Sequence, residues 1–141
     1  MRFMVIIKAN EQSERGELPP PELFEAMHKF NEELVNAGVL LAAEGLLPSA
    51  KGKRVHFKLN GPMTITDGPF AETKELIAGF WLLQCKSIDE CLEWVKRIPS
   101  DGVTTDGDVE IRQVAGPEDL AEAMSPELIE AEAQLKARAE G

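Results

Sequence analysis

The chain has 141 residues, of which 43% are hydrophobic and 28% are charged, as in an ordinary globular domain that is long enough to bury a core. Its formal net charge of −10 argues against nucleic-acid binding, which needs a basic face, and against attraction to anionic membranes. No apolar run approaches the roughly 20 residues that span a bilayer, and the apolar start is too short for a signal peptide. We therefore expect a cytoplasmic protein.

The first part of the chain predicts a strand, a helix and a second strand. A continuous apolar run over residues 2–8 is typical of a central strand, and the polar residues 9–18 follow as a loop. The prolines 19–21 lead into a helix, which we expect to end at Gly38. A second apolar strand is expected over residues 39–43. One helical stripe supports this helix: Leu23, Met27, Phe30, Leu34 and Ala37.

The middle of the chain predicts a hairpin. Residues 48–53 are read as a flexible basic loop, and apolar residues then alternate with polar ones over residues 55–59, as in a half-exposed strand. The Asn60-Gly61 pair is a strong hairpin-turn signal, and residues 63–66 would return as the partner strand.

The second half repeats the first pattern. Residues 79–85 predict a strand, and residues 87–90 have the spacing of a capping box at the start of a helix that ends before Pro99. A loop over 100–107 precedes a last strand over 109–114. The remaining residues are rich in Ala and Glu and predict a helix, marginal alone, that packs on its own domain or on a partner subunit.

This order, β-α-β, then a hairpin, then β-α-β, predicts a ferredoxin-like α+β sandwich with two helices on one face of the sheet. The strands at 3–7 and 80–83 are apolar on more than one side, which two helices cannot cover. We therefore expect face-to-face sheet packing in a homodimer. The domain is expected to cover residues 1–115, with a helical C-terminal extension over 116–141.

The central stretch, residues 67–75, reads DGPFAETKE and predicts a rigid acidic corner. Gly68 tolerates unusual backbone angles, and Pro69 fixes φ and lacks an N–H. An aspartate in a turn usually accepts a hydrogen bond from the N–H two residues on, which Pro69 cannot donate. Asp67 is therefore expected either to accept from the N–H of Phe70 or to point its carboxylate at a non-local group.

These residues resemble the signature of the YCII-related, or DGPF-domain, family. The supporting context is ELVNAGVL at 33–40, EGL at 44–46, EWVKRIP at 93–99 and VEIR at 109–112, so that the resemblance covers roughly residues 2–114. It implies a dimeric α+β barrel, which agrees with the predicted topology. In relatives, enzymatic activity has been suggested through a histidine–aspartate pair in a pocket. DGPF-type proteins are also associated with extracytoplasmic-function sigma factors, although this chain has no sigma-like region.

Three residues are candidates for acid–base catalysis. Asp67 ends a strand at the corner, from where its carboxylate could act as a general acid or base, or could anchor a ligand. His28 flanks the apolar stripe of the first helix, and an imidazole is a side chain suited to proton transfer, although a surface histidine is the more common case. Glu44 follows five apolar residues, so its pKa is expected to be raised by partial desolvation, unless it simply reaches water at the strand end. His56 is expected at the surface.

Three further residues are candidates for substrate binding. Lys74 and Glu72 could supply a cation and a counter-charge beside Asp67, and Phe70 could form a platform, although a core position for its ring is more common. Cys85 and Cys91 lack metal-type spacing and are expected to be buried free thiols, so no metal or cofactor is predicted.

Two functions follow from these observations. The first is a small cofactor-free enzyme that moves a proton on a small polar molecule in a pocket between sheet and helix. The second is a non-catalytic ligand-binding or interaction module associated with transcription regulation.

Overall fold

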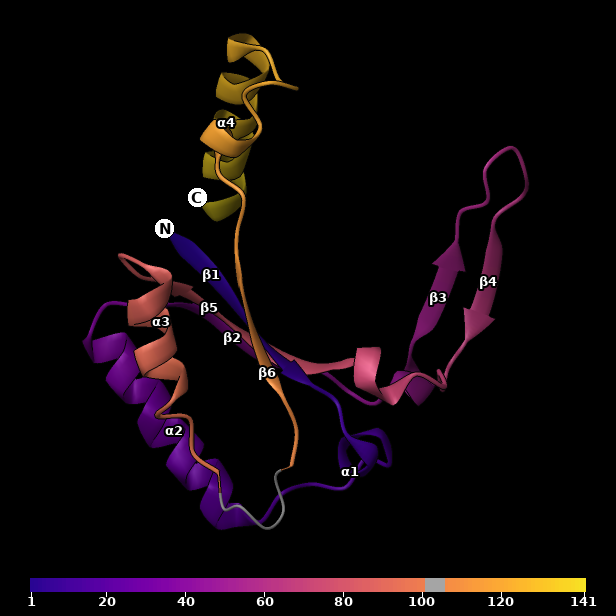
Figure 1. The fold of residues 1–141 in the computed structure, drawn as a ribbon, viewed down its shortest axis with the longest axis vertical. Helices are drawn as coiled ribbons and strands as arrows, with labels where there is room; N and C mark the ends of the chain where they lie inside the picture. Colours follow the sequence, from indigo (N-terminus) through magenta and orange to yellow (C-terminus); the bar gives the residue numbers. More distant parts are fainter. Residues whose placement is uncertain (101–105) are drawn as a thin grey trace.

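The computed structural model describes residues 1–100 and 106–141, and Figure 1 shows their arrangement. In chain order the strands are β1 (Arg2–Lys8), β2 (Leu40–Gly45), β3 (Lys53–His56), β4 (Thr64–Asp67), β5 (Ile77–Gln84) and β6 (Val109–Gln113). The α-helices are α1 (Glu11–Glu14), α2 (Pro21–Asn36), α3 (Ile88–Val95) and α4 (Pro126–Glu140). Single 3₁₀ turns occur at Ser49–Lys51, Thr73–Glu75 and Pro117–Asp119.

The main sheet has four antiparallel strands in the order β2-β5-β1-β6. Central strand β1 pairs with β5 on one side and β6 on the other, so Val5 lies opposite both Trp81 and Ile111. Helices α2 and α3 lie together on one side of this sheet (Figure 1). This is the predicted ferredoxin-like α+β topology, in which the hairpin β3–β4 forms a separate two-stranded sheet between β2 and β5.

The core lies between this sheet and the two helices. Trp81 donates its indole N–H to Asn31 Oδ1 over 2.8 Å, and its ring meets Phe30 edge-on at 5.7 Å between centroids. The hydrogen bond satisfies the one polar atom of a buried indole, so α2 is held in one position along β5. The other buried members of the core are Phe3, Val5, Leu34, Val39, Leu83, Cys85 and Cys91.

The ends of the helices largely follow the sequence signals. Pro21 is the first residue of α2, and Gly38, which has φ of +75°, follows its C-terminal cap. The Ser87 hydroxyl accepts from the Glu90 N–H at the start of α3, as expected. The Glu90 carboxylate accepts instead from the Lys86 N–H, one residue before the cap, so the predicted capping box is only half formed.

Cys85 and Cys91 are both buried and free, as predicted. Burial in an apolar core raises the pKa of the Cys91 thiol to about 12. We expect neither thiol to react with Ellman's reagent at pH 8 until the protein unfolds.

The raised pKa of the Cys91 thiol makes the stability of the protein depend on pH. An unfolded thiol loses its proton near pH 9, whereas folded Cys91 keeps its proton up to about pH 12. The unfolded state therefore binds fewer protons over this interval, and the free energy of unfolding should fall as the pH rises from 9 to 12, by about 1 kcal/mol per pH unit. Urea titrations across this range measure the slope. Cys91→Ala should flatten it, and an equal slope in that variant would contradict the assignment.

Three local predictions are wrong. The expected loop over residues 9–18 contains α1, where the Asn10 side chain accepts from the Ser13 N–H and Ser13 Oγ accepts from the Asn10 N–H. The hairpin is not closed by a two-residue turn, because β3 ends at His56 and β4 begins at Thr64. Its apolar side chains are exposed rather than half-buried, at 44% for Val55 and 67% for Ile65.

Two parts of the molecule stand away from the core. The hairpin with its flanks, residues 51–66, is called the arm, and residues 117–141, which include α4, are called the tail. Both lie away from the side of the sheet that α2 and α3 cover (Figure 1). That uncovered sheet face carries Met4, Ile6, Phe80 and Leu82, which alternate with the buried residues of β1 and β5. No helix within the described ranges is long and apolar enough to cross a membrane.

Candidate functional site

The acidic corner begins with an ion pair at the base of the arm. Asp67 is the last residue of β4 and lies opposite Lys53 of β3, whose ammonium group is 2.6 Å from its carboxylate. Both side chains are at least 70% exposed. The carboxylate thus has a non-local partner across the hairpin, one of the two alternatives that Pro69 left open. An exposed ion pair of this kind contributes only about 0–1 kcal/mol to stability.

The rest of the corner is fixed by a close backbone approach. The Gly68 N–H donates to the carbonyl of Gly52 over 3.0 Å, and the Gly68–Pro69 peptide bond is cis. A Cβ atom on residue 68 would lie 1.7 Å from the carbonyl oxygen of Ser49. Only glycine fits here, so the corner is built to dock on residues 49–52.

A short chain of hydrogen bonds completes this docking. The Phe70 N–H donates to Ser49 Oγ over 3.0 Å, and the Ser49 hydroxyl in turn donates to the Glu14 carboxylate. The other oxygen of Glu14 accepts from the Ser49 N–H over 3.1 Å. Glu14 on α1, Ser49 and Phe70 are far apart in the sequence, and all three are half-buried. Their hydrogen bonds connect α1, the loop before β3 and the corner after β4.

The three candidate binding residues have local partners or reach solvent. Phe70 lies outside the main core, and the Arg54 guanidinium covers its ring at 4.1 Å from the centroid. Glu72 is 3.5 Å from the same guanidinium. Lys74 lies in an exposed 3₁₀ turn, and the cation beside Asp67 is Lys53 instead.

Within one chain the three candidate catalytic residues do not meet. His28 is on α2, 74% exposed, with Nε2 2.7 Å from a carboxylate oxygen of Glu32. Helix α2 lies across the sheet from the arm, which Asp67 directly follows (Figure 1). Glu44 is on β2 opposite Phe80, and its side chain is exposed, so the expected desolvation is absent from the single chain. A catalytic pair of His28 and Asp67 would require a second chain.

The structure instead places a largely apolar cavity with a few polar groups between the sheet and α2, at the C-terminal end of β1. Two adjoining cavities, of about 180 and 430 Å³, share the residues Ile7, Lys8, Asn10 and Met27. Buried Trp81 adds to the apolar wall of the smaller cavity. Asp106 and Asp108 line the same cavity.

Lys8 places a cationic side chain in both cavities. Lys8 is half-buried and makes no ion pair with any residue in the described ranges, although the chain carries a formal net charge of −10. The pairing of β1 with β6 brings it to Asp108, whose carbonyl oxygen accepts from the Lys8 N–H over 3.0 Å. A partly desolvated ammonium without a partner attracts an anionic oxygen.

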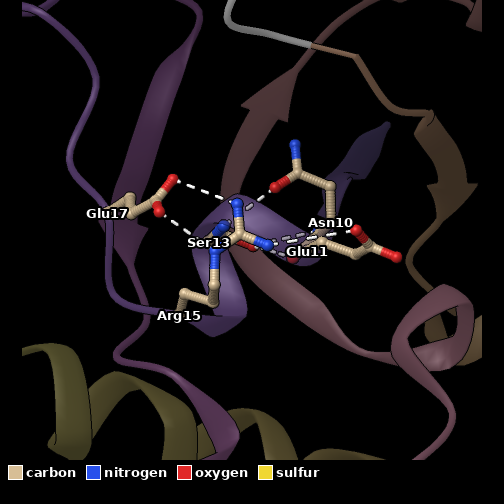
Figure 2. Close-up of polar contacts among 5 residues, drawn as sticks. All are labelled: Asn10, Glu11, Ser13, Arg15 and Glu17. Carbon is tan, nitrogen blue, oxygen red and sulfur yellow. Dashed lines mark hydrogen bonds and ion pairs between the residues drawn. The ribbon is translucent and has the colours of Figure 1, made fainter.

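The outer wall of the cavity is held by polar contacts around α1 (Figure 2). Asn10 Nδ2 donates to the Asp106 carbonyl over 2.9 Å, which ties α1 to the segment before β6. Arg15 donates to both oxygens of Glu17, at 3.0 and 3.2 Å, and this hydrogen bonding lowers the pKa of the Glu17 carboxyl. The wall therefore has a defined shape before any ligand binds.

Sequence reasoning missed Lys8, Asn10, Asp106 and Asp108. The signal for Asn10 was present, because Asn10 and Ser13 have the spacing of a helix cap. The sequence places Lys8 only at the end of a strand and Asp106 only in a loop, and it assigns Asp108 to no element. Their convergence depends on the pairing of the first strand with the last.

Three comparisons with known proteins can be set beside this geometry. Residues 1–117 match the YCII-related domain. An uncharacterized protein of Rhizobium meliloti (strain 1021) is 36% identical over 81 residues, which are 57% of this chain and 64% of that protein. The chain therefore matches less than two thirds of the length of this relative.

The third comparison is with a solved structure. The 5-chloro-2-hydroxyhydroquinone dehydrochlorinase (TftG) from Burkholderia phenoliruptrix AC1100, in complex with 2,5-dihydroxybenzoquinone, is 14% identical, with a TM-score of 0.48. The superposition covers 84% of this chain and 99% of that one. A likeness of this degree carries no weight for the function of the present chain.

Proposed function

The chain belongs to the YCII-related family, and we propose that it is a small enzyme that performs acid–base chemistry on a compact, oxygen-bearing molecule bound beside Lys8. The observation that carries this proposal is the half-buried Lys8, which makes no ion pair with the described residues, in a cavity with apolar and acidic walls. Such a combination of apolar lining and a few convergent polar groups is typical of ligand sites.

The cavity limits the size and character of the substrate. The smaller space, about 180 Å³, equals roughly six water molecules at about 30 Å³ each. Met27, Ile7 and Trp81 favour an apolar body, whereas Lys8 favours a carboxylate, phenolate or enolate oxygen. A small aromatic or enolic acid meets both requirements.

The chemistry would divide between Lys8 and the aspartates. The Lys8 ammonium would hold the oxygen on which negative charge develops, and Asp108 or Asp106 would accept a proton from the neighbouring atom of the substrate. Neither aspartate has an ion-pair partner among residues 1–100 and 106–141. Both residues are exposed.

Replacing Lys8 by methionine tests the site, because methionine retains most of the apolar stem and removes the charge. Benzoate, a compact aromatic carboxylate, serves as the probe, and ¹⁵N NMR follows the amides of residues 7–10 and the Trp81 indole N–H. We expect benzoate to shift these signals in the natural protein. It should bind at least about tenfold more weakly to Lys8→Met, because one charge-assisted hydrogen bond is lost.

Lys29→Met is the matched control, because Lys29 is an exposed lysine on α2 that makes no ion pair with the described residues. It should bind benzoate like the natural protein. If benzoate fails to shift the cavity signals, or if Lys8→Met binds it equally well, the anion site does not exist.

A non-catalytic ligand-binding module, acting with a transcription regulator, is the second candidate. It is favoured by the corner itself, where Asp67, Glu72 and Phe70 are occupied by Lys53 and Arg54. Replacing both candidate bases, Asp106→Asn together with Asp108→Asn, separates the two functions. An enzyme should keep ligand binding and lose turnover in this variant, whereas a binding module has no turnover to lose.

A further inference from the structure

The arm is basic, and its Lys53 and Arg54 are paired with Asp67 and Glu72, which lie just beyond residue 66. Residues 51–66 contain four basic side chains, Lys51, Lys53, Arg54 and Lys58, in a chain whose net charge is −10. Its apolar side chains face solvent, including Phe57 at 75% and Leu59 at 89% exposure. Exposed rings and leucines grouped on a protruding hairpin mark a surface that binds another protein surface.

The tail has the opposite charge. Residues 117–141 contain seven acidic and two basic side chains, a formal charge of −5. Glu127 and Glu132 of α4 make no ion pair with any described residue.

Helix α4 also exposes an apolar stripe. Leu128 and Leu135 are 46% and 53% exposed, and their spacing of seven residues puts them on one face, with Ala131 between them. Glu132 borders this face. The neighbouring face of α4, with Ile129, Glu132 and Ala133, lines a cavity against the segment that precedes the helix. The stripe of Leu128 and Leu135 is thus left without a partner within its own tail.

The arm and the tail of one chain stand apart (Figure 1). The sheet face that carries Ile6 and Phe80 is the one that α2 and α3 leave uncovered. A chain cannot bring its own basic arm to its own acidic helix without moving one of them. A second copy supplies both surfaces at once.

We propose that the chain forms a twofold dimer in which the arm of each copy lies along α4 of the other. Phe57, Leu59 and Met63 of the arm would cover the stripe of Leu128 and Leu135, while Lys58 would approach Glu132. Twofold symmetry produces this contact twice, so each pair of residues counts double in the dimer. The opposite charges select this pairing over arm with arm or tail with tail. The inference does not depend on the cavity at Lys8.

Cross-linking between chains that carry different single cysteines tests the pairing. Leu59→Cys places a thiol on the arm and Leu135→Cys places one on the tail, while the natural Cys85 and Cys91 are 4% and 0% exposed. After the two full-length variants are mixed and allowed to exchange, a short bis-maleimide should yield a covalent dimer of one arm chain with one tail chain. Lys29→Cys, on the outer side of α2, replaces the tail variant as the control. Equal cross-linking with this control, or none with the tail variant, would overturn the proposal.

A charge exchange provides a second measurement. Lys58→Glu and Glu132→Lys should each weaken dimerisation about tenfold in sedimentation equilibrium, because each change introduces like charges at two contacts. The double variant should return to within about twofold of the natural dissociation constant. The pairing of arm and tail would be contradicted if the double variant lost dimer affinity by the sum of the two single losses. It would also be contradicted if the natural protein remained monomeric.

Discussion

Replacing Gly68 by alanine is expected to destabilise the protein by at least about 3 kcal/mol, at the upper end of what overpacking by one methyl group costs. The added Cβ would lie 1.7 Å from the Ser49 carbonyl oxygen and 2.6 Å from its carbonyl carbon. Both are backbone atoms, so no side-chain rotation relieves the clash. The corner must lift off residues 49–52 and lose the hydrogen bond from Gly68 to Gly52.

Gly45→Ala is the matched control for this substitution. Gly45 ends β2, does not have a positive φ, and has no atom within 4 Å of a built Cβ. Its replacement should change the free energy of unfolding by no more than about 0.5 kcal/mol. Urea unfolding measures both variants, and hydrogen exchange at Gly68 and Phe70 shows whether the loss begins at the corner. If both variants are equally stable, the close approach at Gly68 does not exist in solution.

The sequence predicted the fold because its strongest signals concern burial. The stripe on α2 repeats over sixteen residues between Pro21 and a glycine with positive φ, and no other periodicity competes with it. The strands β1 and β5 carry long apolar runs for the same reason. The order of these elements then leaves few topologies, of which the ferredoxin-like arrangement is one.

The register of the hairpin could not be predicted from the sequence. A two-residue turn at Asn60-Gly61 would place Asp67 opposite Arg54, whereas the structure places it opposite Lys53. The observed connection is longer, with Asn60 alone at positive φ. A register shift of one residue moves every side chain to the other face of a strand, so the partner of Asp67 depends on turn geometry that composition does not reveal.

The cavity was missed for a different reason. Lys8 and Asp108 are a hundred residues apart, and neither belongs to a motif of known spacing. They meet because β6 pairs with the edge of β1 that β5 leaves free. A Gly-Pro pair after a strand does mark a constrained corner at residues 67–75. That constraint docks the corner on residues 49–52, and the chemistry we propose lies elsewhere.

The hydrogen bonds of Glu14 carry the second large expected effect. Glu14→Ala should destabilise the protein by about 2–3 kcal/mol, because Ser49 loses a charged acceptor for both its N–H and its hydroxyl. Ser49→Ala should cost about 2 kcal/mol, since the half-buried Phe70 N–H then loses its acceptor. Glu11→Ala, at an 88% exposed position on the same helix, should change stability by less than about 0.5 kcal/mol.

The double variant Glu14→Ala with Ser49→Ala decides whether α1, the loop before β3 and the corner after β4 act as one unit. If Ser49 Oγ transmits the constraint from Glu14 to Phe70, the combined loss should fall short of the two single losses by about 1 kcal/mol, as is usual for residues in one hydrogen-bonded network. Urea unfolding of the four proteins of this cycle measures that difference. Strict additivity would mean that Glu14 only anchors the loop before β3, and that the corner holds its place through Gly68 alone. A shortfall would instead make α1, which forms the wall of the Lys8 cavity, sensitive to the arm and hence to whatever the arm binds.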